Sequence, residues 1–212
     1  YKAENDEELW SWWWYLNDNK EMEGHYVDGR KNGIWTWWFD SGIKQSEGHY
    51  IDDEQDGLWS YFSKDGSVAE EITFSGGKRD GRSTVWLTPE EKQEEKFYKN
   101  GKLDGPSTFW ENGYRSTMTS YKSDSPEGPW VIWFSSSDQI KEQGFHQKGI
   151  REGLTTYYYE DGTMQREGFF KEGLPDGQWT YWNKKGEKDF DFDFGSGLEH
   201  ISLEDLVERD AI

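Results

Sequence analysis

A glycine recurs along this chain at an almost constant interval. The recurring glycines are Gly33, Gly57, Gly81, Gly105, Gly128, Gly153 and Gly177, and successive members are 23 to 25 residues apart. A fixed period of this length is typical of repeat proteins, in which one small unit is copied and each copy contacts mainly its neighbours. The sequence therefore predicts an extended surface rather than a single core with one deep pocket.

Aromatic residues supply most of the apolar area. The 212-residue chain is 32% hydrophobic and 18% aromatic, with 14 Trp, 12 Tyr and 12 Phe. Low mean hydropathy alone is typical of disordered chains. Periodic aromatic residues argue against disorder, because each buries a large area. We expect a folded but thin protein without a thick aliphatic core.

Residues 23–46 illustrate one repeat. The run 34–39 is short, aromatic and bounded by turn residues at 28–33 and 40–42, which is typical of a strand. The stretch 43–50 is the next strand, so each repeat is a β-hairpin. The predicted fold class is all-β: an elongated, single-layer antiparallel sheet of tandem β-hairpin repeats, with fourteen strands in seven repeats.

We divide the chain into three parts. Residues 1–20 are expected to form a degenerate N-terminal cap repeat, and residues 21–187 about seven tandem hairpins. Residues 188–212 are expected to form an acidic cap with a strand at 189–194 and a short C-terminal helix near 202–207. Such caps protect the open edges of a sheet.

Alternation along each strand places equivalent residues in columns on the two faces. Trp35 starts one column, and we expect its face to be the inner, concave one. If Tyr26 pairs with Trp35, then Gly24 lies under the ring of Trp37, an arrangement that stabilises strand glycines. The members of the first column are Trp35, Trp59, Ser83, Ser107, Trp130, Thr155 and Trp179.

The opposite face is predicted to bind a partner protein through two columns. Aromatic side chains favour interfaces because they give a large contact area. The aromatic column is Trp38, Phe62, Trp86, Trp110, Trp133, Tyr158 and Trp182. The acidic column is Glu23, Glu47, Glu71, Glu95 and Glu167.

The formal net charge of −19 is uneven along the chain. Residues 1–10 contain four acidic residues and one Lys, and residues 187–212 contain nine acidic and two basic residues. This charge disfavours nucleic acid, because the attraction to phosphate is absent. The predicted partner is another protein, basic in character, or a neighbouring subunit of an assembly. No apolar run has membrane-spanning length, so membrane insertion is not expected.

The recurring glycines follow a turn-forming residue in five repeats. Asn32 precedes Gly33, and Asp precedes Gly57, Gly81, Gly105 and Gly177. Asn and Asp tolerate left-handed backbone, and Gly adopts it without cost. We interpret the pairs as turns with a backbone role rather than as phosphate-binding loops.

No set of residues predicts an enzyme, a cofactor site or a metal site. His25 and His49 occupy equivalent positions in successive repeats, about 10 Å apart, which is too far to share a metal ion. His146 replaces an aromatic residue and is expected to pack in its column. The acidic residues of 189–193 lack the Gly and Glu of a calcium-binding loop. The chain has no Cys.

These residues resemble the MORN repeat. Its spacing of an aromatic residue and two glycines, Tyr-x-x-Gly-x-x-x-Gly, occurs at 26–33, 74–81 and 98–105. The usual unit continues Gly-x-Gly, whereas this chain has Trp at the last position in four repeats, which is similar to the bacterial variant of YwqK-type antitoxins. The resemblance covers about residues 21–190 and implies the tandem-hairpin fold. Asp53 replaces the first turn glycine in the second repeat.

The leading prediction is a non-catalytic protein-binding repeat scaffold, antitoxin-like or immunity-like, that binds a basic partner through its aromatic and acidic face. One alternative is a structural subunit of a cell-envelope or other large assembly. Another is carbohydrate binding through the aromatic columns. The sequence leaves the compartment open between a bacterial cytoplasm and, after N-terminal processing, the cell envelope. Tyr1 at the start of the chain fits a processed or trimmed N-terminus.

Overall fold

The computed structural model describes residues 7–13 and 19–195. The chain forms two compact units, residues 1–126 and residues 127–212. Both units are all-β, and every described strand pair is antiparallel, as predicted. No helix occurs among the described residues. The helix predicted near 202–207 lies outside them.

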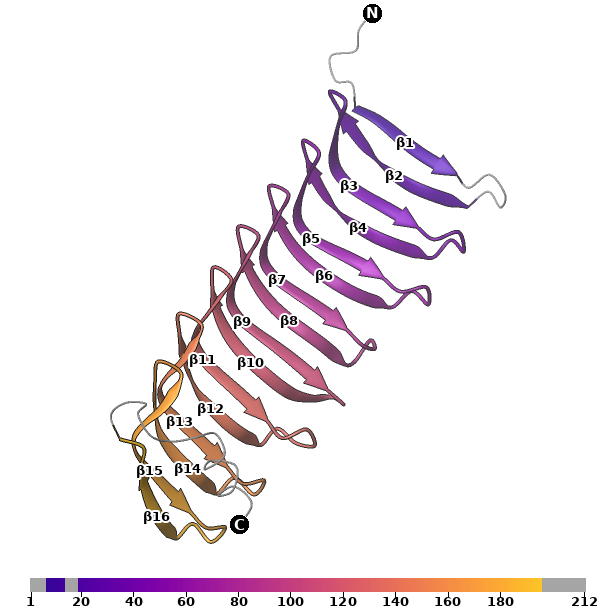
Figure 1. Cartoon of the computed structure of the whole chain (residues 1–212). Coiled ribbons are helices and arrows are strands. Elements are labelled where there is room, and N and C mark those ends of the chain that lie inside the picture. Colours follow the sequence, from indigo (N-terminus) through magenta and orange to yellow (C-terminus); the bar gives the residue numbers. More distant parts are fainter. Residues whose placement is uncertain (1–6, 14–18, 196–212) are drawn as a thin grey trace, which may run out of the picture. The chain divides into compact units, whose positions relative to one another are not determined.

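Ten strands belong to the first unit, and each pairs with the next in chain order (Figure 1). They are β1 (Glu7–Trp13), β2 (Lys20–Val27), β3 (Arg30–Trp38), β4 (Lys44–Ile51), β5 (Glu54–Phe62), β6 (Val68–Ser75), β7 (Lys78–Trp86), β8 (Lys92–Lys99), β9 (Lys102–Glu111) and β10 (Tyr114–Lys122).

Six strands follow, β11 beginning at the unit boundary. They are β11 (Ser125–Trp133), β12 (Ile140–Gln147), β13 (Ile150–Tyr158), β14 (Met164–Lys171), β15 (Leu174–Trp182) and β16 (Lys188–Asp193), again paired in chain order. Strands β2 to β15 correspond to the fourteen predicted repeat strands. The strand predicted at 189–194 is β16, and β1 lies in the predicted N-terminal cap.

The turn predicted over residues 28–33 is shorter than expected. Only Asp28 and Gly29 close it, with φ of 50° and 79°. Positive φ at both central residues is typical of the two-residue turn whose twist matches a hairpin. Asp53 takes the place of Gly29 in the next hairpin with φ 70°. Because the turn is so tight, β3 begins at Arg30, four residues before the predicted start.

The recurring glycines lie inside the odd-numbered strands, and not in turns. The strand pairing places six of them in bulges: Gly33, Gly57, Gly81, Gly105, Gly153 and Gly177. Glu23 pairs with Thr36 and His25 with Asn32, so residues 33–35 oppose the single residue Gly24. All seven recurring glycines have positive φ, between 63° and 127°. The predicted left-handed backbone is therefore confirmed, and its location is corrected. A glycine with positive φ is a common way to build such a bulge.

The bulge sets the position of the tryptophan that follows. A Cβ atom added to Gly24 would lie 2.2 Å from the indole of Trp35, and the Trp35 Nε1–H donates to the carbonyl of His25 at 3.1 Å. The predicted register was wrong, because the bulge shifts the pairing. Tyr26 pairs with Lys31, and the ring over Gly24 belongs to Trp35 rather than Trp37. Trp59 over Gly48 and Trp179 over Gly168 repeat the arrangement.

The main column of buried side chains lies on one face of each unit, which we call face A. Its members are 0 to 4% exposed: Trp35, Trp59, Ser83, Ser107, Trp130, Thr155 and Trp179. In the first unit, neighbouring rings extend the column, with centroids of Trp37 and Trp59 5.7 Å apart and those of Tyr50 and Trp59 5.0 Å apart. Each such ring pair contributes about 0.5–1.5 kcal/mol beyond its buried area. The face predicted to be inner therefore carries the core.

Candidate protein-binding surface

Both predicted binding columns lie on the opposite face, which we call face B. Thr36 and Trp38 alternate with the buried Trp35 along β3, and Glu23 and Glu47 pair directly with Thr36. Each aromatic residue lies at or next to the end of its strand. Trp133 is buried, and the other six are half-buried.

Lysines that the sequence interpretation missed neutralise part of the acidic column. Each precedes its glutamate by three residues. The ion pairs are Lys20–Glu23 at 2.6 Å, Lys44–Glu47 at 2.7 Å and Lys92–Glu95 at 2.7 Å. The recurrence of Lys at the same position of several repeats is visible in the sequence, but the face on which these lysines lie is not.

The same lysines cover rings of the aromatic column. The Lys44 ammonium lies 5.8 Å from the ring centroid of Phe62, and that of Lys92 lies 5.7 and 5.5 Å from those of Trp86 and Trp110. Cation–π contacts at such exposed sites contribute about 0.5–1 kcal/mol. Lysine therefore contacts both columns. At these repeats its positive charge offsets the negative charge of the glutamate on face B.

Glu47 shows the electrostatic consequence. The hydrogen bond from Lys44 is the main cause that lowers the pKa of the Glu47 carboxyl, and burial partly opposes it. Thr36 Oγ1 also donates to Glu47 Oε2 at 3.1 Å. This carboxylate is held by its own hairpin and is less available to a partner.

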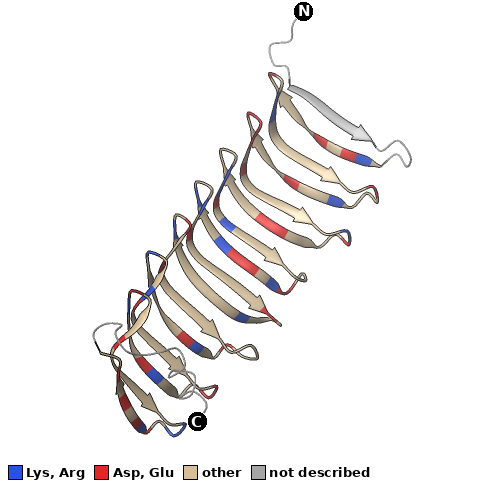
Figure 2. Ribbon diagram, in the orientation of Figure 1, with Lys and Arg blue, Asp and Glu red and all other residues tan. Residues whose placement is uncertain are grey.

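Two members of the acidic column have no such lysine. Val68 and Met164 occupy the lysine position next to Glu71 and Glu167. Neither carboxylate makes an ion pair with any residue that the structure describes. Figure 2 shows the pattern on the ribbon: charged residues gather on the even-numbered strands and at the hairpin tips, and most of the odd-numbered strands is uncharged. Glu71 and Glu167 are the acidic-column members available to a basic ligand.

A further row of side chains on face B was not predicted. It consists of large apolar residues that follow a recurring glycine or the strand glycine opposite it. We call these residues the exposed apolar row: Ile34 and Leu58 in the first unit, 62% and 53% exposed, and Phe145, Leu154 and Phe169 in the second unit, 55%, 45% and 55% exposed. Leu154 pairs directly with Phe169, and Phe145 pairs with Pro129. Their register could have been found from the position next to each glycine.

The histidines do not form a site in the described chain. His25 and His49 are exposed, and no group of three potential metal ligands occurs among the described residues. His146 packs on Trp130 with ring centroids 5.7 Å apart, as predicted for its column. Burial lowers the pKa of His146, and the nearby Arg151 lowers it further. No helix in the described ranges is long and apolar enough to cross a membrane.

Comparison with known families supports the repeat. A family model for the MORN repeat variant matches residues 31–52, 55–75 and 151–172. The matched segments are similar to MORN-type repeats. Each runs from an odd-numbered strand through the following even-numbered strand, so the family unit coincides with the hairpins β3–β4, β5–β6 and β13–β14. A search of curated proteins finds no match. The YwqK-type identity stays a prediction.

Proposed function

We propose that this protein is a non-catalytic repeat scaffold that binds another protein through face B. MORN repeats are commonly binding or scaffold repeats, and the matched hairpins support that class. The observation that carries the proposal is the exposed apolar row. Phe145 and Phe169 are each more than half exposed on a face that already holds the aromatic column. Exposed apolar residues gathered in this way mark interaction sites.

The proposed centre of the surface is the second unit. Glu167 lies two residues from Phe169 on β14 and pairs with Thr156 and Thr180 on the two flanking strands. Tyr158 lies beyond Thr156 on the same face. A partner that buries apolar residues against Phe169 would therefore place a basic side chain against Glu167. Removal of water from such a pair strengthens the attraction between its charges.

The proposed partner is a basic protein. The net charge of −19 attracts such a partner over a distance and speeds its association. Glu71 and Glu167 offer carboxylates that no lysine of this chain neutralises within the described residues. Neutralisation of a basic toxin, the antitoxin-like or immunity-like function, is one form of this proposal and rests on the charge and the repeat type.

The test uses the full chain as bait in an extract of its native source. We expect a basic protein to be retained at low salt and released as salt rises, because exposed charges are screened over about 10 Å at 0.1 M. The double variant Phe145→Ser, Phe169→Ser should no longer retain that basic protein. Leu174→Ser is the matched control, because Leu174 is an exposed apolar residue at a hairpin tip outside the row.

Charge reversal tests the acidic part separately. Glu167→Lys should weaken capture, whereas Glu172→Lys at the exposed tip of the same hairpin should not. In a titration with the purified partner, the Phe145→Ser, Phe169→Ser protein should have an affinity about tenfold or more below that of the wild type. A tenfold loss corresponds to about 1.4 kcal/mol of binding free energy. Equal affinity for the wild type and the double variant would refute face B as the binding surface.

A further inference from the structure

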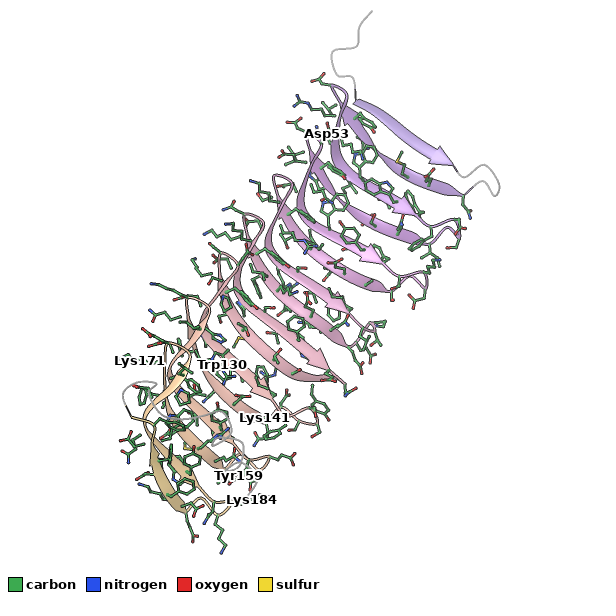
Figure 3. The ribbon with its side chains drawn as sticks, viewed as in Figure 1. Asp53, Trp130, Lys141, Tyr159, Lys171 and Lys184 are labelled. Atoms are coloured by element: carbon green, nitrogen blue, oxygen red, sulfur yellow. The ribbon has the colours of Figure 1, made fainter. Side chains whose placement is uncertain are left out.

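A hollow in the second unit lies beside the proposed protein-binding surface and shares Tyr158 with it. Its volume is 620 Å³, within the range of about 300–1,000 Å³ that small-molecule sites occupy. Glu142, Tyr157 and Arg166 belong to three neighbouring strands and pair with one another across them, so they share one face. Lys141, Tyr159 and Lys184 also line the hollow, and Figure 3 shows them near the ends at which odd-numbered strands lead into even-numbered ones.

Two aromatic rings of the hollow, those of Tyr157 and Tyr159, are held by contacts within the chain. Tyr159 donates its hydroxyl to the carbonyl of Trp182 at 3.0 Å, and Arg151 Nη1 donates to the Tyr157 hydroxyl at 3.3 Å. The guanidinium of Arg166 lies 4.2 Å from the Tyr157 ring centroid and covers that ring. Phe134, Tyr158 and Tyr159 remain as half-buried aromatic side chains of the lining, and Phe134 and Tyr159 are the two on which we build the ligand.

Several polar side chains around these rings have no hydrogen-bond or ion-pair partner among the described residues. Lys141, Glu160 and Gln165 make no hydrogen bond or ion pair with any described residue. Lys184 lies 5.9 Å from the Tyr159 ring centroid and also forms no hydrogen bond or ion pair there. Fixed rings surrounded by free polar groups are typical of a ligand site in which apolar contact gives affinity and polar groups give orientation.

The polar groups indicate which ligand fits. Lysine can only donate, ionised glutamate can only accept, and the amide of Gln165 does both. The hollow is lined by three basic and three acidic residues, so it does not favour a strongly charged ligand: Lys141, Arg166, Lys184, Glu142, Glu160 and Asp161. A ligand with many hydroxyl groups satisfies both kinds of partner, because each hydroxyl donates and accepts. The apolar C–H face of a pyranose ring fits flat against Phe134 and Tyr159.

We propose that this hollow binds a neutral oligosaccharide. The ligand stacks a sugar ring on Tyr159 and exchanges hydrogen bonds with Lys141, Gln165 and Glu160. The hollow shares Tyr158 with the aromatic column of face B, but none of the residues substituted in the tests of the protein-binding surface lines it, so either proposal can fail without the other.

Saturation-transfer NMR on the full chain tests the site with maltotriose, cellotriose, triacetylchitotriose and the acidic trigalacturonate as probes. We expect at least one neutral trisaccharide to receive saturation at its ring C–H protons, and trigalacturonate to receive less. Tyr159→Leu should bind that sugar about tenfold more weakly. Phe39→Leu, at the equivalent position of the first complete hairpin, is the matched control and should bind as the wild type does.

A second pair of variants separates loss of the site from loss of the fold. Lys184→Met should weaken binding, whereas Lys64→Met, at the equivalent position of another repeat, should not. The amide spectrum should be unchanged outside the neighbourhood of each substitution. Absence of binding by all neutral probes, preference for trigalacturonate, or equal binding by wild type and Tyr159→Leu would overturn the proposal. The Phe145→Ser, Phe169→Ser protein should keep sugar binding.

Discussion

At the scale of the residue, the strand glycines show how closely the rings of face A approach the backbone. The indole of Trp59 lies over Gly48, where an added Cβ atom would be 2.2 Å from the nearest ring atom. Gly48 has ordinary backbone geometry, so space alone requires glycine there. The recurring glycines differ, because their backbone conformation requires glycine and open space often surrounds them, as at Gly57.

Gly48→Ala should therefore destabilise the protein by overpacking. The added methyl group must displace Trp59, a change that costs about 1–3 kcal/mol. Urea unfolding followed by tryptophan fluorescence would measure the loss. The double variant Gly48→Ala, Trp59→Ala should show strong coupling, because removal of the ring removes the clash. Strictly additive effects of the two substitutions would contradict this packing.

The residue types along each repeat predicted which side chains share a face, but not how the columns are neutralised. The column of Trp38 and the column of Glu23 could be read from alternation alone. The ion pair of Lys44 with Glu47 depends on a further bulge in this hairpin. Trp37 pairs with Ser46 but Trp38 pairs with Lys44, so the shift brings Lys44 to face B. Such a local departure from alternation has no reliable sequence signal.

At the scale of the element, the tips of neighbouring hairpins are connected by hydrogen bonds. The amide of Gly101 donates to the carbonyl of Arg79 at 2.7 Å, and the amide of Asn100 donates to the carboxylate of Asp80 at 3.0 Å. Glu152 accepts the amide of Glu172 in the same way at 2.9 Å. The acidic residue before a recurring glycine thus caps the next hairpin, although the sequence pattern assigned it to a turn.

Asp80→Ala should weaken this connection without unfolding the hairpin. The Asn100 amide loses its acceptor, a net cost of about 0.5–1.5 kcal/mol. Hydrogen exchange of Asn100 should accelerate, whereas the amide of Gly101 should stay protected because its acceptor is a backbone carbonyl. Unchanged exchange at Asn100 would show that the carboxylate does not cap the turn.

The hairpin elements were predictable because their period is visible in the recurring glycines and aromatic residues. The register of the strands was not predictable. Three residues oppose one at each bulge, and the pairing that results depends on how Trp35 fits over Gly24. The exposed apolar row could have been predicted by alternation, because Phe169 lies two residues from Glu167 on β14. The register adds that Leu154 and Phe169 pair directly on face B.

At the scale of the molecule, stability arises from contacts between strands that are neighbours in the sequence. Among the described residues, the ring contacts of Trp179 come from nearby strands and their ends. Its ring centroid lies 5.3 Å from that of Phe170, 5.7 Å from that of Phe194 and 6.1 Å from that of Tyr157. Repeat proteins built in this way approximate a one-dimensional array, in which a local defect stays local.

Trp179→Ala should therefore unfold the second unit locally and leave the first unit protected. Removal of this nearly buried ring costs about 3–5 kcal/mol, a large share of the stability of a few strands. Hydrogen exchange should rise in β14 to β16 and remain low in β3 to β6. Trp59→Ala is the matched variant, because Trp59 occupies the same column and covers Gly48 as Trp179 covers Gly168. It should raise hydrogen exchange in β3 to β6 and leave it low in β14 to β16. Equal loss of hydrogen-exchange protection in both units after either substitution would contradict this prediction. The chain would then unfold as one cooperative body, because loss of one ring would destabilise strands far from it.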